Sequence, residues 1–122
     1  MPRLALALLF FVAACSAQPA SPTLQEGTWT GGLTPMNHPD MVMPLTYEVS
    51  RAAGDLTITI VNQDLRTAAR DVRIDGDTLR FVFNEPEGDV ALTCALGRQP
   101  GAGYAGRCTD AAGKWARFTM ER

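Results

Sequence analysis

The sequence predicts an all-β protein: a small eight-stranded antiparallel up-and-down barrel with one disulfide. Two observations support this fold. From Gly27 to Arg122, apolar and polar residues alternate with a period of two in one short segment after another, and clusters of turn residues separate these segments. In addition, Cys94 and Cys108 flank a glycine-rich loop at equal distances from its centre. No segment in this range shows a convincing helical period.

The first three strands are expected at residues 27–33, 42–51 and 56–60. The second strand shows the alternation most clearly, because Leu45 and Tyr47 fall on one face while Thr46 and Glu48 fall on the other. Residues 52–55 form the turn to the third strand. There, isoleucines alternate with threonines, so each strand offers one face to a core.

The fourth and fifth strands are expected at residues 69–75 and 78–84. Asp75-Gly76 between them is a strong hairpin signal, since this pair favours the turn that joins two antiparallel strands. Phe81 and Phe83 share one face of the fifth strand with Leu79. The polar loop that follows, residues 84–89, ends this hairpin.

The last three strands are expected at residues 90–96, 104–108 and 114–121. Gly101 lies midway between Cys94 and Cys108, so a hairpin folded about it places the two cysteines opposite each other. Directly opposed residues of antiparallel strands are close enough for a disulfide. Closing this short loop should contribute about 3 kcal/mol to stability.

A sheet with one apolar face must close or fold over to bury that face. Eight strands close into a barrel whose interior is either filled by side chains or holds one small ligand. A flattened sandwich or a half-open roll is the alternative architecture.

The motif Gly27-Thr28-Trp29 resembles the Gly-x-Trp signature of lipocalin-like (calycin) barrels. This resemblance implies that the tryptophan closes one end of the barrel and that a basic residue of the last strand, Arg117 or Arg122, lies across it. The wider pattern Gly-x-Trp-x-Gly, Asp-Gly-Asp-x-Leu-x-Phe and Phe-x-Met-x-Arg is similar to small secreted bacterial domains of uncertain function.

The N-terminus has the pattern of a secretory signal, with Arg3 followed by a short apolar run that ends in small residues. Val12-Ala13-Ala14-Cys15 resembles a bacterial lipobox, which implies a signal peptide at residues 1–14 and lipidation of Cys15. Ser16 after the cysteine implies sorting to the outer membrane, facing the periplasm. Residues 15–26 are expected to form the lipidated cysteine and a flexible tether, and residues 27–122 the barrel domain.

The charge balance gives no indication of a nucleic-acid partner. Removing Arg3 with the signal leaves ten basic and thirteen acidic residues, a net charge of about −3. Lys114 is then the one lysine left, and the arginines are scattered along the sequence. Arg66, Arg70 and Arg73 form a small cluster that aspartates interrupt, which is typical of a solvated strand face.

The sequence does not predict an enzyme. His38 is the one histidine and has Asp40 nearby, yet no serine or thiol is placed beside it by a recognisable motif. Cys94 and Cys108 are expected to form the disulfide. The carboxylates fall in turns and on polar strand faces at no spacing that pairs them.

The stretch Pro35 to Pro44 has two interpretations. Thioethers and an imidazole suit copper, which gives a candidate metal site. The residues of this candidate site are Met36, His38, Met41 and Met43. Alternatively, Met43 belongs to the core and the other three form a lid over the open end of the barrel.

We expect a non-catalytic, lipid-anchored protein of the bacterial cell envelope that is monomeric. It would bind a small apolar ligand or a protein partner and would need no cofactor. The alternatives are a periplasmic copper-binding accessory protein that uses the loop 36–43 and an inhibitor of a secreted hydrolase. The candidate ligand pocket is lined by Trp29, Tyr47, Ile58, Ile60, Leu79, Phe81, Phe83 and Leu92.

Overall fold

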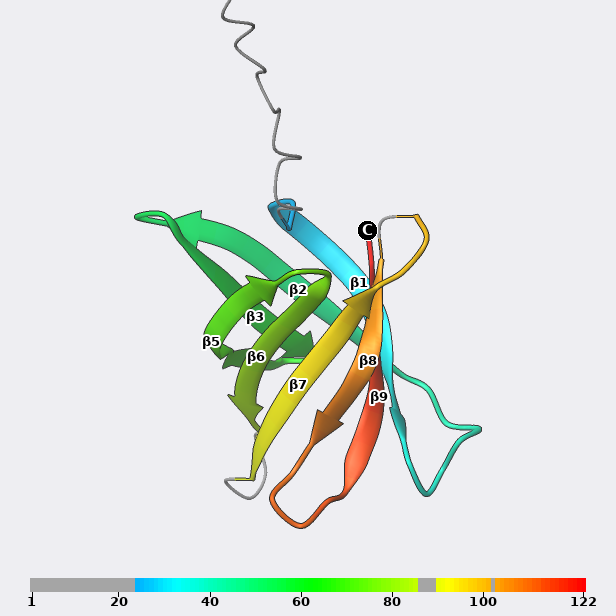
Figure 1. Ribbon diagram of the computed structural model, residues 1–122. Helices are drawn as coiled ribbons and strands as arrows, with labels where there is room; N and C mark the ends of the chain where they lie inside the picture. Colours follow the sequence, from blue (N-terminus) through cyan, green and yellow to red (C-terminus); the bar gives the residue numbers. More distant parts are fainter. Residues whose placement is uncertain (1–23, 86–89, 102) are drawn as a thin grey trace, which may run out of the picture.

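The computed structural model describes residues 24–85, 90–101 and 103–122. The predicted signal peptide, the lipidation site Cys15 and the tether up to residue 23 lie outside the described residues. The described part forms a single antiparallel sheet that rolls into a nearly closed barrel (Figure 1). The strands are β1 (Gly27–Pro35), β2 (Met43–Ala52), β3 (Asp55–Asn62), β4 (Leu65–Ala68), β5 (Arg70–Asp75), β6 (Thr78–Asn84), β7 (Ala91–Arg98), β8 (Tyr104–Thr109) and β9 (Trp115–Glu121).

The sheet order confirms the predicted all-β, up-and-down antiparallel topology. Its strands follow one another as β4-β3-β2-β1-β9-β8-β7-β6-β5. The pairing of β1 with β9 joins the two ends of the chain, and register places Leu33 opposite Phe118. The sheet is therefore continuous except between its edge strands, β4 and β5, and β5 contacts β3 across this gap.

The described residues form nine strands rather than the predicted eight, because the predicted fourth strand begins earlier and is broken into two. Leu65–Ala68 pairs with β3, and the Ala69 amide still donates to the Ile58 carbonyl at 2.8 Å. From Arg70 onward the same chain pairs with β6 instead. Asp71 has φ of 54° beside a register shift, which marks a β-bulge at the point where the chain changes partner. The segment 63–68 lacks apolar alternation because most of it is exposed, so the sequence did not indicate a strand there.

The first described residues, 24–26, contact the barrel, whereas the domain predicted from the sequence begins at Gly27. Leu24 is buried in the core, and the Trp29 Nε1 donates to the Gln25 carbonyl at 2.9 Å. The Glu26 carboxylate accepts from the Arg51 amide at 2.6 Å. Burial of one leucine thus extends the folded domain back to Leu24, into a segment that composition alone assigns to the tether.

The predicted disulfide between Cys94 and Cys108 is confirmed. Register places the two residues directly opposite each other on β7 and β8, with 4.0 Å between their Cα atoms. Both side chains are buried in the core. The bridge joins two neighbouring strands within the wall of the barrel. It therefore fixes their register, and it also lowers the conformational entropy of the unfolded chain.

Two glycines allow the backbones of neighbouring strands to approach closely on the inner side of the barrel. A Cβ on Gly31 would lie 1.8 Å from the Thr119 carbonyl oxygen, and one on Gly106 would lie 2.0 Å from the Ala95 carbonyl oxygen. No side chain fits at either position. Glycine at such sites allows the strong bending that a small barrel requires.

Replacing both bridged cysteines, Cys94→Ala with Cys108→Ala, should lower the free energy of unfolding by about 3 kcal/mol, because the unfolded chain regains the entropy of the open loop. Urea unfolding followed by circular dichroism measures this change. A loss below about 0.5 kcal/mol would contradict the role given to the bridge.

Gly106→Ala should destabilise the barrel by about 1–3 kcal/mol, because the added methyl group collides with backbone rather than with a movable side chain. Gly97→Ala is the matched control, since its Cβ would meet only the Ala105 carbonyl oxygen at 3.8 Å. Thermal unfolding of both variants compares them directly. Equal unfolding midpoints for the two variants would show that the close approach of the strands does not exclude a side chain at position 106.

Candidate functional site

The barrel has an open mouth at the end opposite the point where Leu24 enters it. The β3–β4 connection and the adjoining ends of β2, β6 and β7 lie at this mouth, while Leu24 and the C-terminus lie at the other end (Figure 1). The mouth leads into a pocket of about 810 Å³. Ligand pockets in proteins commonly measure about 300–1,000 Å³, so this space suits a small molecule.

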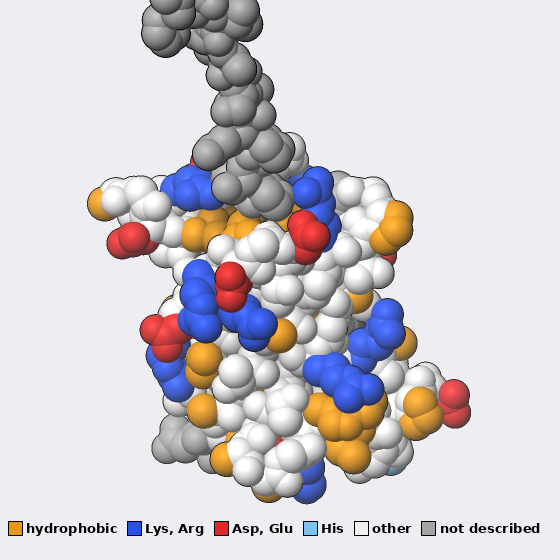
Figure 2. Space-filling view, viewed as in Figure 1, with side chains coloured by type: hydrophobic (Ala, Val, Ile, Leu, Met, Phe, Trp, Pro, Cys, Tyr) orange, Lys and Arg blue, Asp and Glu red, His pale blue; other side chains and the backbone are white. Residues whose placement is uncertain are grey.

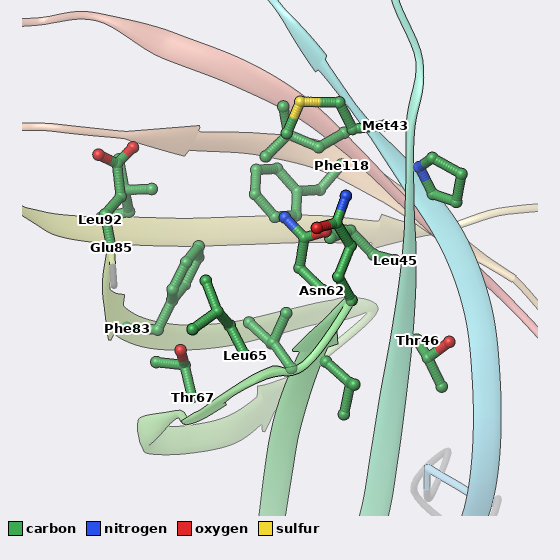
Figure 3. A pocket seen from close by; sticks show the side chains of 15 residues that line it. Met43, Leu45, Thr46, Asn62, Leu65, Thr67, Phe83, Glu85, Leu92 and Phe118 are labelled. Carbon is green, nitrogen blue, oxygen red and sulfur yellow. The ribbon is translucent and has the colours of Figure 1, made fainter. Parts of the chain in front are cut away.

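The walls of the pocket are mainly apolar. Phe83 and Phe118 stand at its inner side with their rings edge to face and 5.7 Å between centroids. Figure 3 shows these rings with Met43 and Leu92 around the cavity. The remaining apolar lining is formed by Leu33, Pro44, Leu45, Ile60, Val61 and Leu65.

Five residues of the lining are polar; Thr46 lies within β2, and the other four lie at or near strand ends. Asn62 and Gln63 follow from the end of β3, Thr67 lies on β4, and Glu85 follows β6. Glu85 is exposed, and its backbone amide donates to the Val90 carbonyl at 2.9 Å. The pocket therefore combines an apolar wall with amide, hydroxyl and carboxylate groups, which can hydrogen-bond a polar end of a ligand.

Of the eight residues predicted to line a pocket, Ile60, Phe83 and Leu92 do line it. The other five are buried in the core away from the cavity; they are Trp29, Tyr47, Ile58, Leu79 and Phe81. All eight face inward, as their parity predicts. Parity alone does not tell which inward residues lie near the open end, and this explains why Leu33, Leu45 and Phe118 were missed.

Tyr47 shows how the middle of the barrel is closed. Its side chain is completely buried, and its hydroxyl donates to the Thr119 carbonyl oxygen at 3.1 Å. Burial raises the pKa of the phenol above its ordinary value, because the charged phenolate would lose its hydration there. The hydroxyl therefore stays protonated and spans the space over Gly31, which lies between β2 and β9.

The opposite end of the barrel is closed by aromatic packing. Trp29 and Tyr104 are both buried, with 6.3 Å between ring centroids, and Leu24 packs in the same core. Of the two basic residues named for this end, Arg122 is the one that lies there, since its guanidinium donates to the Gln25 side chain. Arg117 is exposed, and in the sheet register it lies opposite Arg107 of β8 and Thr34 of β1.

The predicted copper site divides into two parts. Met43 lies in β2 and lines the pocket. Met36, His38 and Met41 are exposed on the β1–β2 connection, where the Met41 amide donates to the His38 carbonyl at 3.0 Å. The Met36 Sδ accepts from the Trp115 amide at 3.5 Å, so this thioether faces β9.

The predicted lid is not formed, since the β1–β2 connection projects away from the barrel (Figure 1) and no residue from 36 to 42 lines the pocket. In the described part of the chain, no group of three His, Cys, Asp or Glu side chains is placed to hold a metal ion. The same residues contain no helix long and apolar enough to cross a membrane.

Comparison with known proteins supports the fold. A redesigned β-barrel of known structure resembles the chain with a TM-score of 0.62 over 81% of this chain and 91% of that one, at 15% sequence identity. No family model matches the sequence, and no curated protein matches it. The likeness thus extends to the barrel architecture and carries no information on ligands.

Proposed function

We propose that this protein is a non-catalytic, lipid-anchored component of the bacterial cell envelope whose barrel mouth binds a small apolar ligand. The observation that carries this proposal is the open pocket of about 810 Å³ with its largely apolar wall. A core filled throughout would have favoured a protein partner or a metal. The N-terminal sequence supports the anchor, because it resembles a lipobox ending in Cys15.

The orientation of the barrel supports ligand binding at a membrane surface. The chain enters at the end closed by Leu24 and Trp29, so the proposed tether to Cys15 would attach there. The mouth lies at the other end and would face away from the anchoring membrane. In the outer membrane, such a mouth would open into the periplasm, where it can receive a ligand without the bilayer blocking it.

The rim of the mouth adds a second apolar feature. The large apolar side chains that are most exposed in the described residues all lie on connections or strand ends at this end of the barrel: Met36, Met41, Val42, Leu65 and Val90. Of these five residues, Leu65 also lines the pocket, so its exposed side chain is placed to contact an entering ligand. The projecting β1–β2 connection, which carries Met36, Met41 and Val42, also fits the alternative function of a hydrolase inhibitor.

The pocket is tested by filling it. The full chain should bind the neutral fluorescent probe N-phenyl-1-naphthylamine with increased emission, and Met43→Trp should abolish or strongly weaken this binding, because the indole occupies the mouth. Met41→Trp is the matched control, since Met41 is exposed and does not line the pocket. Absence of binding by the unchanged protein, or equal loss in both variants, would contradict the proposal.

Copper binding is the second candidate function, and exposure of its ligands favours it. Met36, His38 and Met41 are all accessible to a metal within one short connection. Thioethers and imidazole suit Cu(I). The site would need Met36 to leave the Trp115 amide, which is an exposed contact and therefore weakly held.

A competition titration with a Cu(I) chelator tests this second function. Tight one-to-one binding that disappears in the variant Met36→Ala with His38→Ala would establish a copper site on the β1–β2 connection. Met43→Ala is the control, because Met43 faces the pocket. No binding, or equal binding in all three proteins, would leave the apolar pocket as the functional site.

A further inference from the structure

Register places four arginines in one continuous row on the outer face of the barrel. Arg73 lies opposite Arg80, Arg80 opposite Ala95, Ala95 opposite Arg107, and Arg107 opposite Arg117. We call this set, Arg73, Arg80, Arg107 and Arg117, the arginine row. Figure 2 shows Lys and Arg side chains over β5 and β6, where acidic side chains lie beside them, and over β8 and β9, with further basic side chains at both ends of this face.

The half of the row formed by Arg107 and Arg117 lacks compensation by carboxylates. Like charges directly opposite each other on neighbouring strands are destabilising. The positions next to this pair on the same face hold Ala95, Thr119 and Trp115, none of which is acidic. Along β9, the next carboxylate is Glu121, about 13 Å beyond Arg117 in an extended strand.

The acidic groups nearest the row have other partners. Asp110 accepts from the backbone amides of Ala112 and Lys114 within the β8–β9 turn. At the other half of the row, Asp75 lies 3.6 Å from the Arg80 guanidinium, and Asp71 and Asp75 flank Arg73 along β5. The positive charge is therefore least balanced at Arg107 and Arg117, in a protein whose formal net charge is −2.

Arg107 is also held in place. Its guanidinium stands over the ring of Trp115, 4.0 Å from the centroid. This cation–π contact orders the side chain without using its hydrogen-bond donors, so the donors stay available to an anion. Arginine donors form a fork that matches carboxylate and phosphate groups.

We propose that the arginine row binds a linear acidic polysaccharide, with one anionic group held between Arg107 and Arg117 and the chain continuing over Ala95 toward Arg80. Adjacent strands lie about 4.8 Å apart, so the row extends over about 19 Å, with about 10 Å between Arg80 and Arg107. An extended chain of charged sugars matches this shape. Between the two halves lies Ala95, whose side chain is a single methyl group.

Two other polyanions fit less well. The row runs around the curved wall across β5 to β9, so a flat anionic membrane would approach its middle more closely than its two ends. Single-stranded nucleic acid requires aromatic side chains on which bases stack. The aromatic ring beside the row is that of Trp115, and Arg107 already covers one face of it.

Binding of polygalacturonate to the full chain tests this proposal, with Trp115 fluorescence as the readout, since Trp29 is buried at the closed end. The variant Arg107→Gln with Arg117→Gln should bind about tenfold more weakly, because it loses two exposed charge contacts. The control variant, Arg51→Gln with Arg66→Gln, removes the same charge from β2 and β4 and should change binding by no more than about twofold. Circular dichroism confirms that both variants fold.

Three outcomes would overturn the proposal. These are no binding of polygalacturonate, equal loss in the two double variants, and binding of phosphatidylglycerol vesicles or poly(dT) at least as tightly as polygalacturonate. Neutral dextran provides the uncharged comparison, and it should not bind. Retention of polygalacturonate binding by the control variant and its loss in the row variant would support the proposal.

Discussion

The structure depends on one constraint: each strand has a single apolar face, and the sheet can bury these faces only by rolling up. The pairing of β1 with β9 achieves this by joining the first and last strands of the described chain. The close approach of backbones at Gly31 and Gly106 allows the sheet to bend enough. Because every strand shares the same interior, a change in this curvature alters the core and the pocket together.

The interior is filled unevenly, and this produces the candidate site. Trp29, Tyr104 and Leu24 close the end at which the chain enters, and Tyr47 fills the middle. At the other end, Phe83 and Phe118 stop short of the rim, and smaller side chains form the wall. The pocket is thus a consequence of where the largest side chains lie along strands that are otherwise alike in pattern.

Much of the fold follows from local patterns. Alternation predicted the faces of the strands, and the position of Gly101 midway between Cys94 and Cys108 predicted both their pairing and the register of β7 with β8. The short strand β4 could not be predicted from alternation, because it is mostly exposed and is stabilised as a strand by its pairing with β3.

Features that depend on several strands at once could not be read from the sequence. The arginines of the row are separated along the chain and appeared scattered, and only the registers of β5 to β9 bring them together. Which residues line the pocket likewise depends on how several strands are arranged together. Ile58 and Ile60 share one parity on one strand, yet only Ile60 lies near enough to the mouth to line it.

This difference allows the most direct test of the central claim, that the barrel mouth is a ligand site. The isoleucines of the chain are Ile58, Ile60 and Ile74. With isotope-labelled isoleucine methyl groups, titration of the full chain with N-phenyl-1-naphthylamine should shift the NMR signal of Ile60 while those of Ile58 and Ile74 stay in place. Unchanged signals, or equal shifts at all three residues, would contradict a ligand site at the mouth.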